Sequence, residues 1–297
     1  NAIDLTTMAD RLQKNWFHLF LRNPQQFHAT TIMPNFWPAG KSVRPDVLDG
    51  DPGQQIDAIW QYLEPGRQAR MPSGVQPEPI NYGPSGGEAV MLRRQFAGIG
   101  KRGIGIGYPA GINLSFDAAL CRVGSIWRGP FAEMSGVWRG QGSRNVKERA
   151  DELVRFPGGP ALALLEDKDS PWPVVEEAVK APGFQFKGYA LDSVQRPTFR
   201  YSFSGVEITD ALLDKVEGPS VTRTMHFVGD VSDEMVLRAA AGRDLSKGEN
   251  PRSFRFGPSL LLTISAEGYV RTSGEEKELL VPLGGLKSIK INYEFLP

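Results

Sequence analysis

The chain has 297 residues, a length that fits one large domain or two smaller ones and favours two. Hydrophobic residues make up 40% of the sequence and aromatic residues 10%, enough for a packed core, which excludes an intrinsically disordered chain. The 34 basic and 34 acidic side chains balance, which argues against a protein that binds nucleic acid through its phosphates.

The first 66 residues are predicted to form a small helical module. Apolar residues at three- and four-residue spacing, beginning at Met8 and reaching Phe20, predict a helix that ends before Pro24. Residues 25–50 are predicted to form a long loop. A second helix is predicted to begin after Asp51, a good N-cap residue, with Pro52 in the first helical position.

Residues 67–88 are rich in proline and glycine and predict a linker. Over residues 89–297 the apolar pattern has a period of two, and glycine, proline and aspartate separate short candidate strands. These strands are 90–96, 103–108, 112–117, 119–127, 161–165, 184–191, 197–203, 206–210, 220–228, 236–241, 253–257, 260–265, 269–273, 278–283 and 288–295. The predicted fold class is therefore mainly β with a small α module, in which a large antiparallel β-sandwich follows the helical module.

The sequence contains one cysteine, Cys121. A single cysteine excludes an intrachain disulfide, a thiolate zinc site, an iron–sulfur cluster and a C-x-x-C-H haem attachment within this chain. There is no run of about 18 apolar residues, so no transmembrane helix is predicted. The chain begins with Asn1 and not with methionine, which favours a processed or incomplete chain.

The segment that points most clearly to a function is the predicted loop between the two helices, where Met33 is followed by Pro34. A methionine thioether is a soft, neutral ligand, and histidine–methionine coordination raises the potential of haem iron, which suits electron transfer. Met33 is the candidate axial ligand of a haem iron. The candidate cofactor-binding residues are Met33, Pro34, Phe36, Trp37 and Trp16, and Trp60 is a further candidate for the apolar wall.

Other interpretations of this segment remain open. A methionine before a proline in a loop is commonly a core residue. Two histidines, His18 and His28, are alternative ligands, although the first is expected at the helix boundary and the second in a hydrogen-bonded loop.

Three stretches in this order resemble the second half of a class I cytochrome c. They are LQKNWFHLFLRNP at 12–24, IMPNF at 32–36 and QIDAIWQYL at 55–63. The resemblance implies a partial cytochrome c-like module over residues 1–66 that binds haem c. The family's C-x-x-C-H attachment motif is absent, so either an upstream segment or a separate chain carries it, or the module has lost its haem.

The remaining sequence resembles a region of large secreted multidomain proteins of planctomycete-type bacteria. The resemblance is carried by residues 102–142, 184–189, 197–203 and 205–210. Those proteins join a sugar-dehydrogenase-like propeller, a c-type cytochrome and a β-rich domain. The resemblance implies a periplasmic or extracellular location and a redox partner or dehydrogenase domain as partner.

Several residues of the β-rich region permit other chemistry. Gly103, Gly105 and Gly107 do not form a G-x-G-x-x-G motif and are expected to permit close packing. Trp127, Trp138 and Trp172, with the nearby Arg128 and Arg139, have two interpretations. They line a sugar-binding groove, or the tryptophans are core residues and the arginines lie at the surface. The candidate acid–base carboxylates are Glu133, Glu166, Asp167 and Asp169, although 166–169 is expected to be a solvated turn.

The sequence therefore predicts an extracytoplasmic electron-transfer protein, or a fragment of one, with a haem-facing methionine loop and a β-sandwich for binding or assembly. The alternative is a haem-free carbohydrate-binding or structural assembly subunit of a larger complex. A third possibility is a carbohydrate-active enzyme on the sandwich. No catalytic constellation is recognised, and neither a nucleic-acid partner nor a membrane span is expected.

Overall fold

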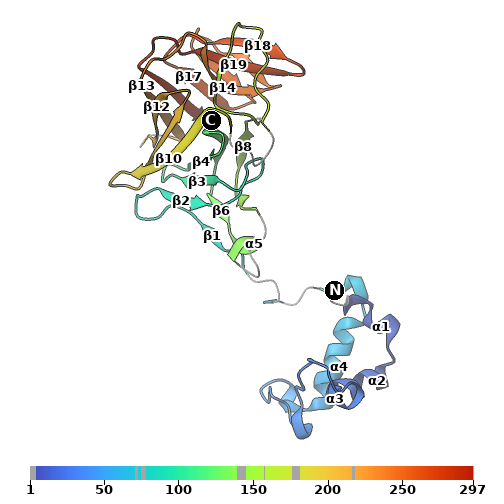
Figure 1. Cartoon of the computed structure of the whole chain (residues 1–297). Helices are drawn as coiled ribbons and strands as arrows, with labels where there is room; N and C mark the ends of the chain where they lie inside the picture. Colours follow the sequence, from blue (N-terminus) through green and yellow to red (C-terminus); the bar gives the residue numbers. More distant parts are fainter. Residues whose placement is uncertain are drawn as a thin grey trace. The chain divides into compact units, whose positions relative to one another are not determined.

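A computed structural model of the chain describes residues 5–70, 73–74, 78–138, 145–156, 158–175, 181–215 and 218–296. The chain divides into two compact units, a helical unit formed by Asn1–Glu78 and a β unit formed by Pro79–Pro297 (Figure 1). The fold is mainly β, with antiparallel sheets and a small α module, as predicted from the sequence. No helix among the described residues is long and apolar enough to span a membrane.

The helical unit contains short helices joined by loops. The helices are α1 (Met8–Arg11), α2 (Lys14–Arg22), α3 (Pro24–Phe27) and α4 (Pro52–Leu63), with 3₁₀ turns η1 (Leu5–Thr7), η2 (Pro38–Gly40), η3 (Leu48–Gly50) and η4 (Gly66–Gln68). The second predicted helix is confirmed as α4. The Oδ1 atom of Asp51 accepts a hydrogen bond from the backbone N–H of Gln54 at 2.7 Å, so Asp51 is its N-cap.

The first predicted helix is interrupted. Leu12 has an extended backbone conformation, with φ −119° and ψ 147°, and separates α1 from α2. The apolar spacing continues across this break because Met8 and Leu12 both still pack against the buried cluster of the helical unit. The hydrophobic period therefore could not reveal the interruption.

The core of the helical unit is small. Its buried apolar side chains are Phe17, Leu21, Trp37, Ile56, Trp60 and Leu63. The rings of Phe17 on α2 and Trp60 on α4 meet edge to face, with centroids 5.3 Å apart. This contact joins the two longer helices of the unit.

The β unit contains four antiparallel sheets. The eight-stranded sheet has the order β10 (Phe184–Leu191), β11 (Pro197–Phe203), β12 (Val206–Asp214), β13 (Ser220–Val228), β20 (Ser288–Phe295), β17 (Leu260–Ile264), β16 (Ser253–Phe256) and β15 (Leu245–Lys247). The five-stranded sheet has the order β2 (Val90–Arg93), β3 (Gly103–Gly107), β4 (Ile112–Asp117), β5 (Arg122–Arg128) and β8 (Glu152–Arg155).

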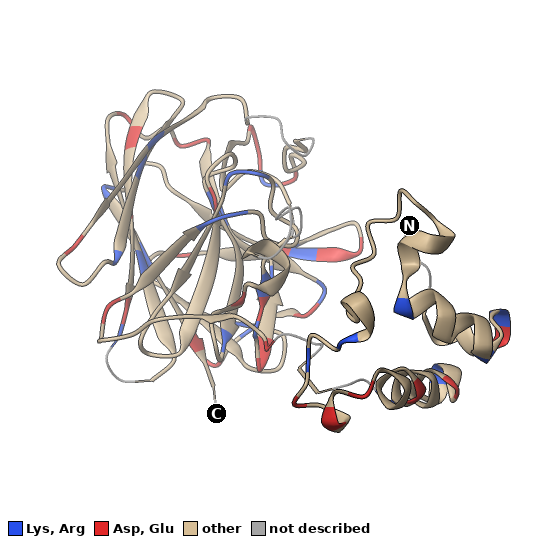
Figure 2. Cartoon of the chain, turned by 90° about the horizontal axis from the view of Figure 1, so that it is seen from below, with Lys and Arg blue, Asp and Glu red and all other residues tan. Residues whose placement is uncertain are grey.

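The two smaller sheets complete the β unit. The four-stranded sheet has the order β18 (Tyr269–Ser273), β19 (Glu276–Pro282), β14 (Met235–Gly242) and β9 (Leu162–Leu164). The three-stranded sheet has the order β1 (Asn81–Tyr82), β6 (Ala132–Glu133) and β7 (Lys147–Glu148), and a short helix α5 (Ser135–Trp138) follows β6. Figure 2 colours the positions of Lys and Arg blue and those of Asp and Glu red, and both colours are spread over the ribbon of the β unit.

A single cluster of buried side chains joins the eight-stranded sheet to the five- and four-stranded sheets, which makes the β unit a sandwich. Phe116 of β4 and Phe199 of β11 stack across it, with ring centroids 4.0 Å apart. The other face of the five-stranded sheet is covered as well, by a second cluster that contains Phe96, Trp127 and Phe131. Strands β3, β4 and β5 are therefore buried on both faces.

The glycines of β3 make this double burial possible. A Cβ atom at Gly105 would collide with the ring of Phe96, and one at Gly107 would lie 2.7 Å from Cγ of Phe131. The expectation of close packing is confirmed, because the missing side chains leave the space that these two rings fill.

Every strand predicted from the period-two pattern is present: six have the predicted bounds, and the ends of the others differ by up to four residues. The strands that the pattern missed are β1, β6, β7, β8 and β15. The first of these, β1, lies within the stretch 67–88 that was predicted as a linker. It pairs with β6, and Ile80 is held there by hydrogen bonds to Met134 and Ser135. Two-residue strands carry too little alternation to be recognised from sequence.

Candidate functional site

The Met33 loop lies against the core of the helical unit. Met33 is half-buried and packs on the buried cluster, while Pro34 is exposed. The backbone N–H of Met33 donates to Oγ1 of Thr31 at 3.2 Å. The thioether is thus held beside apolar side chains on a loop whose next residue cannot donate a backbone hydrogen bond.

Trp37 anchors this loop to α4. It is 6% exposed, and its Nε1–H donates to Oε1 of Gln55 at 2.7 Å. The same buried glutamine donates to the carbonyl oxygens of Arg44 and Val47, at 3.0 and 2.6 Å. Gln55 therefore fixes the second half of the loop, from Trp37 to Val47, to one helix. Sequence reasoning missed this role, although a polar residue next to Ile56 at the start of an apolar stripe is a possible signal.

The other two aromatic candidates are exposed. Trp16 is 38% exposed and stacks on Phe20, with centroids 4.8 Å apart, beside Phe27. Phe36 is 46% exposed and meets Trp37 edge to face. The structure thus brings Met33 and Trp37 to the buried cluster and places Trp16 in an aromatic group at the surface.

Both histidines of the helical unit have side-chain partners. Nε2 of His18 lies 3.1 Å from Oδ1 of Asp57, which also accepts from Lys14 at 2.7 Å. The hydrogen bond from Lys14 lowers the pKa of Asp57. Nδ1 of His28 lies 3.1 Å from the hydroxyl of Thr30. Within the described residues, no group of three or more His, Cys, Asp or Glu side chains can hold a metal ion.

These observations define what the helical unit can offer a haem. A thioether and apolar side chains match the chemistry of one axial position and one haem face. Each of the two histidines has a hydrogen-bond partner at one ring nitrogen, Nε2 of His18 and Nδ1 of His28. The one cysteine of the sequence, Cys121, is buried in the β unit, so this chain does not supply the C-x-x-C-H attachment. The residues present fit the methionine side of a haem pocket.

In the β unit, two of the three candidate tryptophans are core residues. Trp127 is fully buried and its Nε1–H donates to the carbonyl oxygen of Phe131 at 3.1 Å, while Trp172 donates to that of Pro160 at 3.1 Å. Trp138 is exposed. Arg128 lies 3.7 Å from Glu152, and Arg139 is outside the described residues. The structure does not bring these tryptophans into one sugar-binding groove.

The candidate carboxylates do not form a catalytic pair either. Glu133 accepts from the backbone N–H of Ser135 at 2.6 Å. Asp167 accepts from the backbone N–H groups of Asp169 and Ser170, and these bonds lower its pKa. The segment with Glu166 is therefore the solvated turn that was expected. His226 is exposed, and Cys121 is buried at φ +51°, in a turn that delays the start of β5 to Arg122.

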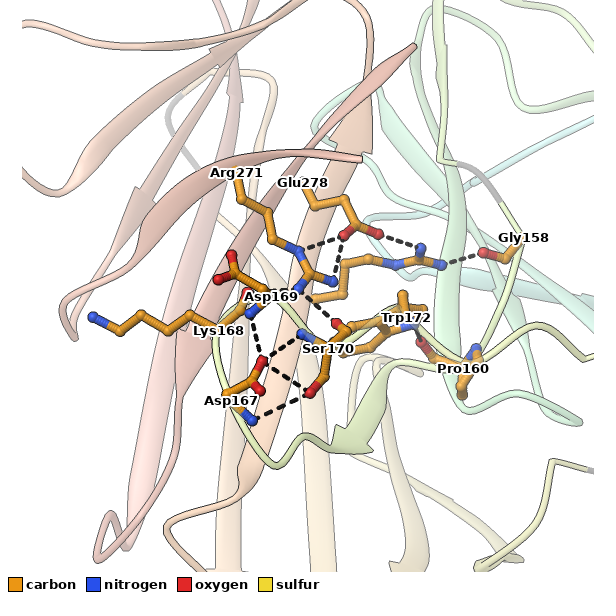
Figure 3. A network of polar contacts seen from close by, with 10 residues as sticks. Gly158, Pro160, Asp167, Lys168, Asp169, Ser170, Trp172, Arg271 and Glu278 are labelled. Carbon is orange, nitrogen blue, oxygen red and sulfur yellow. Dashed lines mark hydrogen bonds and ion pairs between the residues drawn. The ribbon is translucent and has the colours of Figure 1, made fainter. Parts of the chain in front are cut away.

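A charged network lies on the outer face of the four-stranded sheet (Figure 3). Glu278 accepts from Nη1 of Arg238 at 3.0 Å and from Nε of Arg271 at 2.9 Å. Arg271 also donates to the carbonyl oxygens of Lys168 and Ser170, both at 2.7 Å. The guanidinium of Arg238 lies 4.9 Å from the ring centroid of Trp172. The network therefore ties the loop before Trp172 to the sheet.

A second ion pair is buried inside the sandwich. Asp210 on β12 accepts from Nη2 and Nε of Arg223 on β13, at 2.6 and 3.0 Å, and from the hydroxyl of Tyr201 at 2.9 Å. Burial raises the pKa of Tyr201, and the charge of Asp210 raises it further. Burial is the largest single effect on Arg223 and lowers its pKa, but the interactions with Asp210, Tyr201 and Tyr293 together outweigh it, so the pKa of Arg223 is raised.

The sequence does hold a signal for this pair. Asp210 follows Val206 and Ile208 in the inward phase of β12, and Leu212 continues it. Arg223 occupies the same phase of β13 as Val221 and Met225. A charged residue in the apolar phase of a strand is rare unless it is paired, so two such residues on neighbouring strands predict an ion pair.

A groove at the surface of the β unit is lined by cations and aromatic rings. Its volume is about 850 Å³, and its lining includes Arg93, Lys101, Arg102, Phe186 and Tyr189. No acidic side chain is among its lining residues. Within the described residues, none of the three cations forms an ion pair.

No model of a known protein family matches this chain, and no curated protein matches it in sequence.

Proposed function

We propose that the helical unit is the methionine-bearing part of a c-type haem module, and that the chain is an extracytoplasmic electron-transfer protein or a fragment of one. The observation that carries the proposal is the setting of Met33. Its thioether sits at the edge of a small apolar core, in a unit that leaves many large apolar side chains uncovered. A porphyrin would cover apolar surface of this kind.

In this proposal Met33 is an axial ligand, and Trp37 holds the loop through its bond to Gln55. Pro34, Phe36 and Trp16 shape the apolar surroundings. The bound haem supplies a one-electron couple, and the apolar setting with a thioether ligand raises its potential. An upstream segment or a separate chain supplies the C-x-x-C-H motif and the second axial ligand. The β unit binds or assembles with a redox partner or dehydrogenase domain in the periplasm or outside the cell.

The test is a visible spectrum of the natively purified protein, reduced and oxidised, with a pyridine haemochrome assay. We expect a c-type spectrum and the charge-transfer band of methionine-ligated ferric haem. Met33→Leu keeps the packing volume and should abolish that band and lower the potential. The matched control is Met8→Leu, since Met8 is half-buried against the same cluster and is not a proposed ligand.

A protein that is folded and carries no haem contradicts the proposal. A haem spectrum that is unchanged by Met33→Leu would remove Met33 as a ligand.

A second candidate function rests on the cationic groove of the β unit. Arg93, Lys101 and Arg102 supply positive charge that no acidic side chain of the described residues pairs with, and Tyr189 offers an aromatic face. Sugars stack on aromatic rings, and anionic groups pair with guanidinium groups. This combination supports a haem-free protein that binds an acidic carbohydrate.

Calorimetric titration with a uronic-acid oligosaccharide and a neutral one of equal length tests this candidate. We expect binding of the acidic sugar alone, weakened by salt and at least tenfold by the double change Lys101→Gln and Arg102→Gln. Lys247→Gln is the control, because Lys247 is exposed and outside the groove. Equal binding of the acidic and the neutral oligosaccharide would exclude recognition of the sugar's negative charge by this groove.

A further inference from the structure

A small cavity lies where three sheets of the β unit meet. Its volume is about 20 Å³, room for one particle of roughly the size of a water molecule. Three arginines line it, Arg122 from β5, Arg223 from β13 and Arg238 from β14. They come from the five-, eight- and four-stranded sheets respectively. Guanidinium groups are donors only, so the cavity is surrounded by hydrogen-bond donors with positive charge.

Arg122 is the least satisfied of the three. It is 6% exposed, and it donates to the carbonyl oxygens of Phe156 and Gly98, at 3.3 and 3.0 Å. Its nearest carboxylate, Asp117, is 4.0 Å away and accepts from the backbone N–H of Ala119. The buried Nε–H of Arg122 has no acceptor among the described residues. Such a donor loses its hydration without compensation.

The three lining arginines are neutralised to different degrees. Each has one carboxylate beside it, which is Asp117 for Arg122, Asp210 for Arg223 and Glu278 for Arg238. The ion pair of Arg223 with Asp210 has a length of 2.6 Å, whereas Arg122 lies 4.0 Å from Asp117. A buried charge with so distant a partner regains little of the free energy that it loses with its hydration.

The pKa values of Arg122 and Arg238 also show that their charges are incompletely compensated. Burial lowers the pKa of Arg122, and Asp117 offsets this only in part. Burial also lowers the pKa of Arg238, against the opposing effect of Glu278, and the charge of Arg122 lowers it further. The two guanidinium groups repel each other across the site.

We propose that this cavity binds one chloride ion, held by Arg122 together with Arg223 and Arg238. A single halide supplies a negative charge beside Arg122 and an acceptor for its Nε–H, which has none among the described residues. The cavity is too small for phosphate or a carboxylate ligand. The ion joins the three sheets at one point, so its role is to stabilise the sandwich.

The first test is thermal unfolding of the full chain in chloride and in gluconate at equal ionic strength. Ligand binding to the folded state raises stability by mass action, and a chloride concentration near one hundred times Kd should raise the midpoint by about 5 °C. Arg122→Gln should remove the difference between the two salts. Arg155→Gln is the control and should keep it, because Arg155 is half-exposed, pairs with Glu148 and does not line the cavity.

The second test does not depend on a variant that folds. Crystals of the unmodified protein soaked in bromide should show an anomalous peak in the cavity beside Arg122. A midpoint that is the same in both salts overturns the proposal, as does a chloride effect that persists in Arg122→Gln. A cavity without bromide overturns it as well.

Discussion

In the β unit one cluster of buried side chains runs through three sheets, and a second covers the far face of the five-stranded sheet. Among the described residues of the helical unit, six large apolar side chains form the buried cluster, whereas eleven large ones are exposed. Ile32 is fully exposed, and Leu5 and Leu19 are more than half exposed. The sheets cover one another, but the short helices leave much of their apolar surface uncovered.

The two units therefore differ in how much of their stability comes from burying apolar surface. A small module buries a smaller share of its surface than a large domain does, so it gains less from the hydrophobic effect. We therefore expect the helical unit to open at a lower free energy than the β unit, which amide hydrogen exchange measures directly. A cofactor or partner that binds the folded helical unit would raise its opening free energy toward that of the β unit.

The largest expected effect comes from breaking the buried ion pair of the β unit. Asp210→Ala leaves Arg223 buried without its counter-charge, and we expect a loss of about 3–5 kcal/mol in the free energy of unfolding. Denaturant titration measures this loss. The control is Asp46→Ala in the helical unit, where the pair with Arg44 is exposed and a negligible change is expected. If both variants lose a similar free energy of unfolding, burial does not distinguish the ion pair of the β unit from that of the helical unit.

The next effect concerns the double burial of β3. Gly105→Ala places a methyl group against the ring of Phe96, and overpacking of this kind costs about 1–3 kcal/mol. The matched control is Gly100→Ala, since a Cβ atom there meets nothing within 4 Å. If the two variants unfold at the same denaturant concentration, the packing explanation for the glycines of β3 is wrong.

A smaller effect is expected at the start of α4. Asp51→Ala removes the hydrogen bond to Gln54 and should cost the helical unit about 1 kcal/mol. Hydrogen exchange in α4 should become faster while exchange in β12 stays unchanged. Asp51→Ser, which restores a capping oxygen, should recover most of the protection. A change that reaches β12 would show that the units unfold together.

The smallest effect is the titration of Asp46. The hydrogen bond from Arg44 lowers the pKa of Asp46 from 3.8 to about 2. A carboxyl with a lowered pKa contributes stability above its unfolded value, and this contribution is lost as the pH falls from about 4 to about 2. Carbon NMR of the carboxyl group measures the pKa, and Arg44→Gln should return it toward 3.8. A pKa that is normal in the unmodified protein contradicts this pairing.

Much of the fold was predictable because strands and one helix carry clear local patterns. The alternation of apolar and polar residues marks the ends of β11 and β20, and the N-cap and the apolar stripe mark the ends of α4. The break at Leu12 was not predictable, since the apolar spacing continues through it. The short strand β1 was hidden for a similar reason, because pairing with β6 and not its own sequence makes it a strand.

The candidate sites also differ in whether a local sequence pattern indicates them. The sequence alone indicated the Met33 loop, because a methionine, a proline and aromatic residues lie within a few positions of one another. The buried pair of Asp210 and Arg223 left a readable trace in the phase of two strands. The cavity beside Arg122 left none, since its three arginines come from three sheets and are more than a hundred residues apart at the extremes.

By itself the sequence determined most of the longer strands and the helix α4, because the period of apolar residues acts locally along the chain. It also determined that the charges balance overall. Only the tertiary structure decided which charges are buried together, since sheet pairing brings distant residues to one point. Burial and pairing, and not residue type, make Arg122 a candidate ligand of an anion while Arg155 remains a surface residue.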